Sequence, residues 1–280
     1  MSYLKSVIKV PLVFIENIVF TLFPNSRETI EKLVFNPYFF GSDHADYSVK
    51  QFDAFLKKIQ PEKISGKNLL ELGPGGSIGF GLLALKSGAQ KYFALENGNH
   101  ARLDSDSLEE YRKILDDSSL FRECFAPNRT FNPEKIQFIQ SDQSSHYPVP
   151  ENSIDFIYSC AVLEHVHDLD LCFSEMSRVL KTGGIMNHQV DLRDHIFSQK
   201  SLWFLNIPDR FFRIFFSKTG EYVNRKRLSY YLQLFEKNRL EVVSLEKTIV
   251  FRGKLSKRLL KKYTKGDLRA LSFNVILRKS

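Results

Sequence analysis

Residues 69–79 read LLELGPGGSIG and are the most informative segment of the chain. An apolar run passes into a glycine-rich turn and then into further apolar residues, a pattern typical of a buried strand that enters a helix. Such a turn lets backbone N–H groups come close to a ligand. The stretch is not the dinucleotide-binding fingerprint, because Ile78 stands where GxGxxG, counted from Gly73, requires its third glycine. A Walker phosphate loop is also excluded, because no Gly-Lys-Ser/Thr follows.

Strands and helices alternate on both sides of this turn. The helix expected around residues 169–180 is the clearest, with one apolar stripe and Gly183-Gly184 as its predicted stop. A further helix is expected near residues 228–235. Short strands are predicted at residues 68–72, 92–95, 136–140, 154–159, 185–190, 241–250 and 272–277. This alternation predicts an α/β fold with a mostly parallel sheet and helices on both faces.

Two units are predicted along the chain. Residues 1–60 are apolar and rich in phenylalanine, which indicates a helical N-terminal cap or a membrane-facing segment. Residues 61–280 form the α/β domain, and residues 192–222 read as an insertion after the fifth strand. The apolar stretch 7–23 is interrupted by Lys9, Pro11 and Glu16, so it is too short for a spanning helix, and no signal-peptide cleavage site follows it.

The charge of the chain is concentrated in one place. The 280 residues include 40 Lys and Arg against 32 Asp and Glu, a net charge of +8. Residues 252–269 alone contribute eight cations and one Asp, or 8 − 1 = +7, so the rest of the chain is nearly neutral. This distribution argues against a nucleic-acid partner. Peripheral membrane contact through residues 7–23 and 252–269 is one expectation, and packing or capping on the domain, or a solvated helix face, are the others.

The cysteines indicate a reducing compartment. Cys124, Cys160 and Cys172 are an odd, sparse set without CxxC spacing, so no disulfide framework is expected. A cytoplasmic location is therefore predicted, with peripheral membrane association as a further possibility. Cys160 and Cys172 read as small core residues.

Polar residues follow the predicted strands where a ligand would bind. Glu96 ends the second strand, 21 residues after Gly75, and a carboxylate there can accept both hydroxyl groups of a ribose. Asp142 follows the third strand and can accept a hydrogen bond from an exocyclic amine. Ligands of open parallel sheets bind beyond the carboxyl ends of the strands, so these segments converge on one crevice.

Taken together, these segments resemble the class I S-adenosylmethionine-dependent methyltransferases, which have a Rossmann-like seven-stranded sheet. The matching stretches are ELGPG (71–75), the strand ends at Glu96 and Asp142, DFIYSCAVLEHV (155–166) and RVLKTGG (178–184). The match covers about residues 65–191 well and 223–278 loosely. Ser77 replaces a third glycine that many members have, but the turn itself is complete.

The resemblance implies S-adenosylmethionine as the cofactor and assigns residues to it. Glu71, Gly73, Pro74 and Gly75 would surround the methionine moiety. Glu96 would bind the ribose, Asp142 with its neighbour Gln143 would bind the adenine amine, and Cys160 would lie beside the cofactor.

The reaction implied is methyl transfer to an acceptor that the sequence does not identify. Aromatic residues in 36–47 and 192–222 suggest a small or lipid-like, apolar or aromatic acceptor. A base is needed only for a protonated nucleophile such as a hydroxyl, and His188 and His195 are the candidates. The alternative is a non-catalytic S-adenosylmethionine-binding regulatory or interaction module of the same fold.

No metal site is expected. Glu164-His165 resembles the Glu-His pair that binds a divalent metal in some quinone O-methyltransferases, but Ala161 stands where those enzymes have a further carboxylate. A second group has a spacing that could suggest metal ligands, namely His188, Asp191, Asp194 and His195. Alternation along a strand, however, sends neighbouring side chains to opposite faces.

Overall fold

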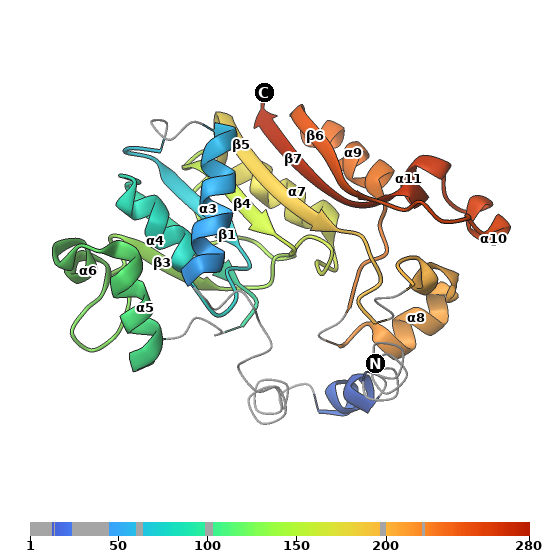
Figure 1. Cartoon of the computed structure of the whole chain (residues 1–280), viewed down its shortest axis with the longest axis horizontal. Helices are drawn as coiled ribbons and strands as arrows, with labels where there is room; N and C mark the ends of the chain where they lie inside the picture. Colours follow the sequence, from blue (N-terminus) through green and yellow to red (C-terminus); the bar gives the residue numbers. More distant parts are fainter. Residues whose placement is uncertain are drawn as a thin grey trace.

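The computed structural model describes residues 13, 15–23, 45–59, 64–98, 103–196, 200–219 and 222–280. In these residues a seven-stranded sheet has the order β3-β2-β1-β4-β5-β7-β6 (Figure 1). Strands β1 to β5 run parallel to one another, and β7 is antiparallel to both β5 and β6. The strands are β1 (Asn68–Leu72), β2 (Lys91–Glu96), β3 (Ile136–Gln140), β4 (Ile154–Cys160), β5 (Leu180–Asp191), β6 (Leu240–Val250) and β7 (Ala270–Lys279). The predicted seven-stranded, mostly parallel sheet is confirmed.

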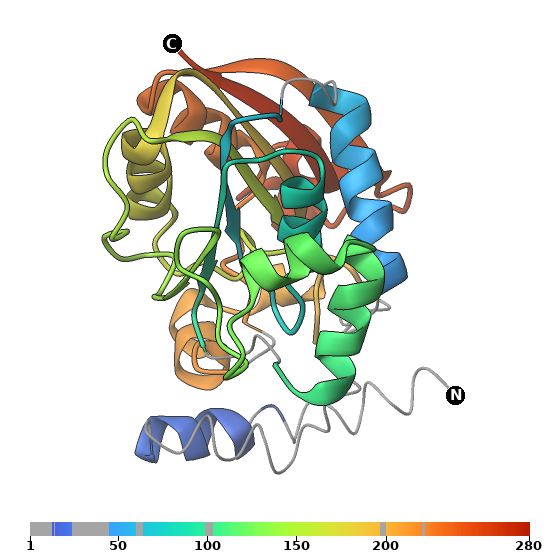
Figure 2. The same cartoon turned by 90° about the vertical axis from the view of Figure 1, so that its left-hand side faces the viewer.

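Helices cover both faces of the sheet, as predicted. Figure 2 shows α3 and α4 on one side and α7 on the other. Side chains alternate between the faces, so that Leu70 and Leu72 join the core beneath α7 and α9, whereas Leu69 joins the core beneath α3, α4 and α5. The helices of these layers are α3 (Ala45–Ile59), α4 (Gly79–Lys86), α5 (Ser105–Leu115), α6 (Ser118–Cys124), α7 (Leu169–Val179) and α9 (Leu228–Lys237).

The predicted end of α7 is wrong. The helix begins at an Asp168 cap, whose carboxylate accepts the Leu171 N–H at 3.0 Å, but it ends at Val179. Leu180 is fully buried and already pairs with Ile154 as the first residue of β5. The register of β4 against β5 then shifts, and Gly183-Gly184 occupy that irregularity. Burial of the apolar Leu180 side chain ends the helix before Gly183 and Gly184. The two glycines instead accommodate extra residues at the start of β5.

The insertion predicted after the fifth strand is confirmed and builds a separate apolar cluster. It contains a 3-10 helix, η5 (Trp203–Asn206), and α8 (Asp209–Phe216), while α10 (Lys257–Leu260) and α11 (Lys265–Arg269) lie between β6 and β7. Val13, Phe212 and Leu259 are buried in the same cluster. The N-terminal helical residues, the insertion and the basic segment 252–269 thus meet at one end of the molecule. Residues 1–12, 14, 24–44, 60–63, 99–102, 197–199 and 220–221 lie outside the described residues, and the boundary near residue 60 stays a prediction.

Candidate cofactor and active site

The glycine turn after β1 is tightly enclosed. Gly73 and Gly75 have φ values of +65° and +67°, in the left-handed region that favours glycine. The Gly73 N–H donates to the Leu95 carbonyl at 2.8 Å. A Cβ atom at Gly73 would lie 2.5 Å from Cγ2 of Val162, so no side chain fits there. The turn is therefore held against the carboxyl ends of β2 and β4.

Glu96 joins the end of β2 to this turn. Its carboxylate is buried, and Oε2 accepts the Gly75 N–H at 2.8 Å while Oε1 accepts the Asn97 N–H at 2.8 Å. A carboxylate oxygen has two lone pairs, so it can accept a hydrogen bond besides the one from a backbone N–H. Two residues that sequence spacing had paired are therefore in direct contact.

Glu71 lies beneath the turn as a protonatable group. The Tyr92 hydroxyl donates to Oε2 of Glu71 at 2.6 Å. Burial raises the pKa of Glu71 to about 8, although the Tyr92 hydrogen bond acts in the opposite direction. The carboxyl group therefore carries a proton near neutral pH in the free protein.

A narrow cavity of about 50 Å³ opens between the turn, α3 and the end of β4. The Tyr47 hydroxyl lies 3.5 Å from Sγ of Cys160, and the Tyr158 hydroxyl donates to Oε1 of Gln51 at 2.9 Å. These contacts fix α3 over the cavity. Its lining residues are Tyr47, Ser48, Gln51, Glu71, Gly73, Pro74, Ser77, Phe80, Tyr158 and Cys160.

Four residues expected at the cofactor thus share one cavity, and α3 contributes a wall that no motif indicated. Tyr47 belongs to the aromatic segment 36–47, which was expected on the acceptor side; residues 36–44 of it lie outside the described residues. Gln51 carried no signal in the sequence beyond its place on an amphipathic helix.

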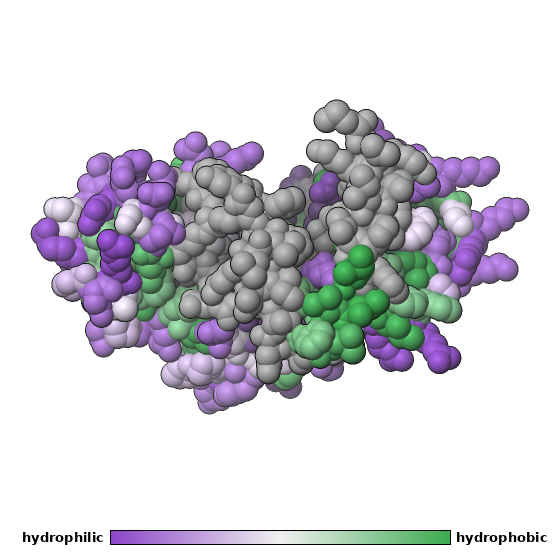
Figure 3. All heavy atoms as spheres, turned by 90° about the horizontal axis from the view of Figure 1, so that it is seen from below, coloured by the Kyte–Doolittle hydropathy of each residue, from purple (hydrophilic) through white to green (hydrophobic). Residues whose placement is uncertain are grey.

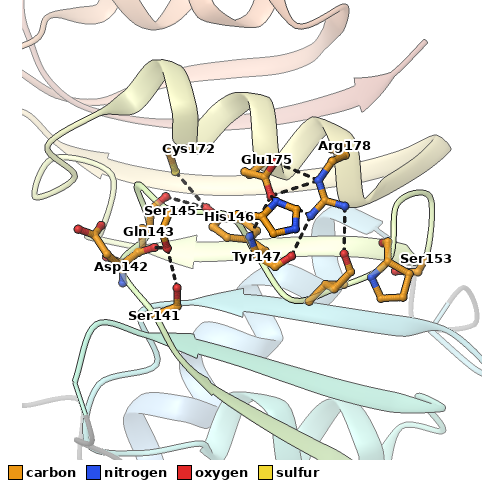
Figure 4. Close-up of polar contacts among 12 residues, drawn as sticks. Ser141, Asp142, Gln143, Ser145, His146, Tyr147, Ser153, Cys172, Glu175 and Arg178 are labelled. Atoms are coloured by element: carbon orange, nitrogen blue, oxygen red, sulfur yellow. Dashed lines mark hydrogen bonds and ion pairs between the residues drawn. The ribbon is translucent and has the colours of Figure 1, made fainter.

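Asp142 and Gln143 follow β3 on a well-anchored loop. Asp142 is exposed and its Oδ1 accepts the Ser144 N–H at 2.6 Å, while Gln143 is buried and its carbonyl accepts the Tyr147 hydroxyl at 2.9 Å. In Figure 4 the Asp142 carboxylate points away from the polar network that surrounds Tyr147. The Asp142 side chain therefore faces outward at the sheet edge.

That network comes from α7 and was missed in the sequence. Arg178 donates to the carbonyls of Tyr147 and Val149 at 2.9 and 3.1 Å, and Glu175 Oε2 accepts the Tyr147 N–H at 2.9 Å (Figure 4). Arg178 also forms an ion pair of 2.8 Å with Glu175. The signal was present as opposite charges three residues apart on a predicted helix, a spacing that places both on one side.

A second polar cluster lies where β4 and β5 end. Glu164 is fully buried, its Oε1 accepts the Asp191 N–H at 3.2 Å, and burial raises the pKa of Glu164 to about 8. Nε2 of His195 lies 3.7 Å from Oδ2 of Asp191, which also pairs with Arg193 at 2.6 Å. Burial alone would raise the pKa of Asp191, but the hydrogen bonds from His195 and Arg193 outweigh it and hold the pKa well below its usual range.

Comparison with known families agrees with this geometry. Residues 108–187 match a family model described as "Methyltransferase domain". Residues 108–187 thus resemble methyltransferase domains, and the strand order is that of a class I, Rossmann-like fold.

Two relatives match only a short segment of this chain, which in turn covers only a small part of their own length. Sterol 24-C-methyltransferase from Pneumocystis carinii is 44% identical over 52 residues, which are 19% of this chain and 14% of that protein. A sterol 24-C-methyltransferase from Gibberella zeae is 40% identical over 52 residues, 19% of this chain and 13% of its own length. The solved S-adenosylmethionine-dependent methyltransferase from Mesorhizobium loti is 17% identical, with a TM-score of 0.49, over 85% of this chain and 100% of that one.

The two candidate bases, His188 and His195, lie in different environments. His188 is fully buried with its ring against Phe173, and its Nδ1 lies 2.8 Å from the Ser159 hydroxyl. Burial lowers the pKa of His188 to about 3, so this imidazole is neutral and sealed in the core. His195 lies beyond the end of β5 and is partly exposed, where a substrate can reach it.

Glu164, His165 and His195 lie close enough together to hold a divalent ion. Ligand atoms of Glu164, His165 and His195 all lie within 4.8 Å of one another, and the Tyr222 carbonyl is 2.6 Å from Nδ1 of His165. The sequence placed Glu164-His165 and His195 in two separate candidate groups, and the fold brings them together because His195 lies beyond the end of β5. A carboxyl with a pKa near 8 is protonated at neutral pH and is then a poor ligand, so the expectation of no metal stays a prediction.

Proposed function

We propose that this domain binds S-adenosylmethionine and transfers its methyl group to a small or lipid-like apolar or aromatic acceptor. The hydrogen bond from the Gly75 N–H to Glu96 carries the proposal, because it joins the glycine turn to the residue suited to a ribose. The cofactor would supply an electrophilic methyl group on a sulfonium that is already a good leaving group. The protein is then left with positioning and desolvation.

The residues present fit such a cofactor. Gly73 is packed where a Cβ would collide, so the backbone itself forms the wall of the site. We assign Glu71, Gly73, Pro74 and Gly75 to the methionine end, Glu96 to the ribose, and Asp142 with Gln143 to the adenine. Cys160 would line the site as a partly buried thiol, whose pKa burial raises, and we assign it no role as a nucleophile.

His195 is the residue that we propose takes a proton when the acceptor has one to lose. Asp191 lies beside the ring and stays ionised, so it can orient the imidazole toward the acceptor. His188 does not enter this proposal, because no part of its side chain is exposed.

A lipid-like acceptor is supported by two observations. The 52-residue match is to proteins named as sterol 24-C-methyltransferases. The insertion also places a cluster of buried phenylalanines at the same end of the molecule as His195, which is next in sequence to the cluster member Ile196. A cytoplasmic location remains a prediction from the three unpaired cysteines.

The proposal is tested by calorimetric titration with S-adenosylmethionine, followed by transfer of a labelled methyl group into a lipid extract. We expect binding, thermal stabilisation and label in an organic-soluble product. Absence of both heat and stabilisation would refute the cofactor assignment, whereas binding without transfer to any acceptor would favour a non-catalytic module. His195→Ala should bind the cofactor normally and lose transfer to a hydroxyl acceptor; unchanged transfer would remove His195 from the reaction.

Glu71 predicts a pH dependence for cofactor affinity. A cationic ligand favours the ionised carboxylate, so below pH 8 binding must release the Glu71 proton. Affinity should rise up to ~tenfold per pH unit as the pH approaches 8 from below, and then level off. Calorimetry in two buffers of different ionisation enthalpy measures the released proton. The α-amino group of the ligand also titrates, but it does so equally in experiments with the wild type and with Glu71→Gln. Parallel pH profiles of affinity for the two proteins would therefore contradict the assignment of Glu71.

A further inference from the structure

Apolar side chains are exposed on two adjoining helices at one end of the molecule. On the N-terminal helical residues, Ile15 and Leu22 are 55% and 66% exposed, and Phe23 at their end is 62% exposed. On α8, Phe211 and Ile214 are 54% and 51% exposed. Figure 3 looks onto this end and shows hydrophobic side chains gathered beside hydrophilic ones. These five residues, with Ile18, are called the apolar face below.

The two helices are fixed to each other, so the apolar face is a built surface. Asn17 is buried between them, where its Nδ2 donates to the Ile214 carbonyl at 2.7 Å and its Oδ1 accepts the Lys218 N–H at 2.9 Å. Phe20 and Phe212 point inward and are 4% and 5% exposed. Each helix therefore already has a core side, and its other side exposes apolar residues to solvent.

Cations surround this face. Arg210, Arg213 and Lys218 are exposed on or just after α8. The acidic residue of α8, Asp209, is paired with Lys262 at 3.1 Å and with Arg225 at 3.3 Å. Because Leu259 of α10 is buried in the same cluster as Phe212, the exposed Lys257, Arg258 and Lys261 are held at this end as well. Half-buried Glu16 is the acidic residue of the N-terminal helical segment.

We propose that the apolar face docks on the surface of an anionic lipid bilayer. Apolar residues on helices that lie in the plane of a membrane enter the boundary between headgroups and acyl chains, and lysines and arginines beside them are attracted to anionic headgroups. A second copy of the chain is the poorer partner, because a two-fold contact would bring the same cations together. No helix within the described ranges is suited to cross a bilayer.

This inference goes beyond methyl transfer, since docking needs neither cofactor nor acceptor. Docking would also bring the insertion close to a lipid-like acceptor, because α8 of the insertion forms part of the apolar face. The basic segment 252–269 and the N-terminal stretch, far apart in sequence, act as one surface through their common apolar cluster.

Vesicle flotation of the full chain tests the proposal. We expect binding to phosphatidylcholine vesicles that contain phosphatidylserine, weaker binding to pure phosphatidylcholine, and loss of binding at high salt. Phe211→Ser with Ile214→Ser should reduce partitioning at least ~tenfold. The matched control is Val242→Ser with Val243→Ser, which changes two side chains on β6 that are 41% and 45% exposed. The control should bind as wild type does.

Three outcomes would overturn the proposal. They are no flotation of the wild type with anionic vesicles, equal flotation of the Phe211/Ile214 and Val242/Val243 variants, and a wild-type dimer in sedimentation that the Phe211/Ile214 variant alone abolishes. Titration of the same variants with S-adenosylmethionine keeps the two proposals separate. A docking variant that still binds the cofactor leaves the proposed function intact, whereas a wild type that floats without binding cofactor leaves docking intact.

Discussion

Gly75→Val is expected to lower the affinity for S-adenosylmethionine by ~100-fold or more. Valine is a strained residue at a φ of +67°, so the turn must rearrange, and the hydrogen bond from Gly75 to Glu96 is lost with it. Loss of two hydrogen bonds of about 1–1.5 kcal/mol each, one to Glu96 and one to the ligand, already gives roughly this factor. Isothermal titration calorimetry measures the affinity.

Gly183→Val is the matched control for this experiment. Gly183 has a φ of +77°, and a Cβ there would meet no atom within 4 Å. It lies near the start of β5, at the amino ends of the parallel strands, whereas the turn lies at their carboxyl ends. The variant therefore has similar backbone strain without touching the site. We expect similar losses of thermal stability and normal cofactor binding in the control. Equal affinities of the two variants would show that the turn does not contact the ligand.

Glu96→Ala is expected to cost between ~10²- and ~10⁴-fold in affinity. Hydrogen bonds to a charged group contribute about 1.5–3 kcal/mol each, and the carboxylate is proposed to receive two ribose hydroxyls. The variant also leaves the N–H groups of Gly75 and Asn97 without their acceptor. Calorimetry with S-adenosylmethionine and with its 2′-deoxy analogue separates these effects. The wild type should prefer the hydroxylated ligand, and Glu96→Ala should bind both equally.

Asp142→Ala supplies the comparison for Glu96. The Asp142 side chain is exposed and a single hydrogen bond to an amine is proposed for it, so its loss should cost only about tenfold. A larger loss at Asp142 than at Glu96, or retained discrimination against the deoxy ligand in Glu96→Ala, would reverse the assignment of the ribose site.

The sequence predicted the parts of the site that depend on strand ends and on turn chemistry. Apolar runs located the strands, and the spacing of Gly75 and Glu96 anticipated their contact, because parallel strands end at one edge of a sheet. Predicting Gly183-Gly184 as a helix stop failed, because tertiary burial of Leu180 took precedence over local glycine preference.

Contacts between distant segments were beyond the sequence. Tyr47 meets Cys160 across 113 residues, and no periodicity records such a pairing. His188 and His195 looked equivalent in one polar stretch, yet one points into the core and the other lies past the strand end. Burial of this kind depends on which face of a strand meets a neighbouring helix, and that is set by the assembled sheet.

The cover that α3 forms over the cavity has a kinetic consequence. Small-molecule sites usually measure roughly 300–1,000 Å³, whereas this one is about 50 Å³. The end of α3 that bears Phe55 and Ile59 is anchored in the core, while its opposite end is joined to the site by the contacts of Tyr47 and Gln51. Ligand entry must first break these contacts. We therefore expect the association rate to be governed by how often α3 opens and not by diffusion to the carboxyl ends of the strands.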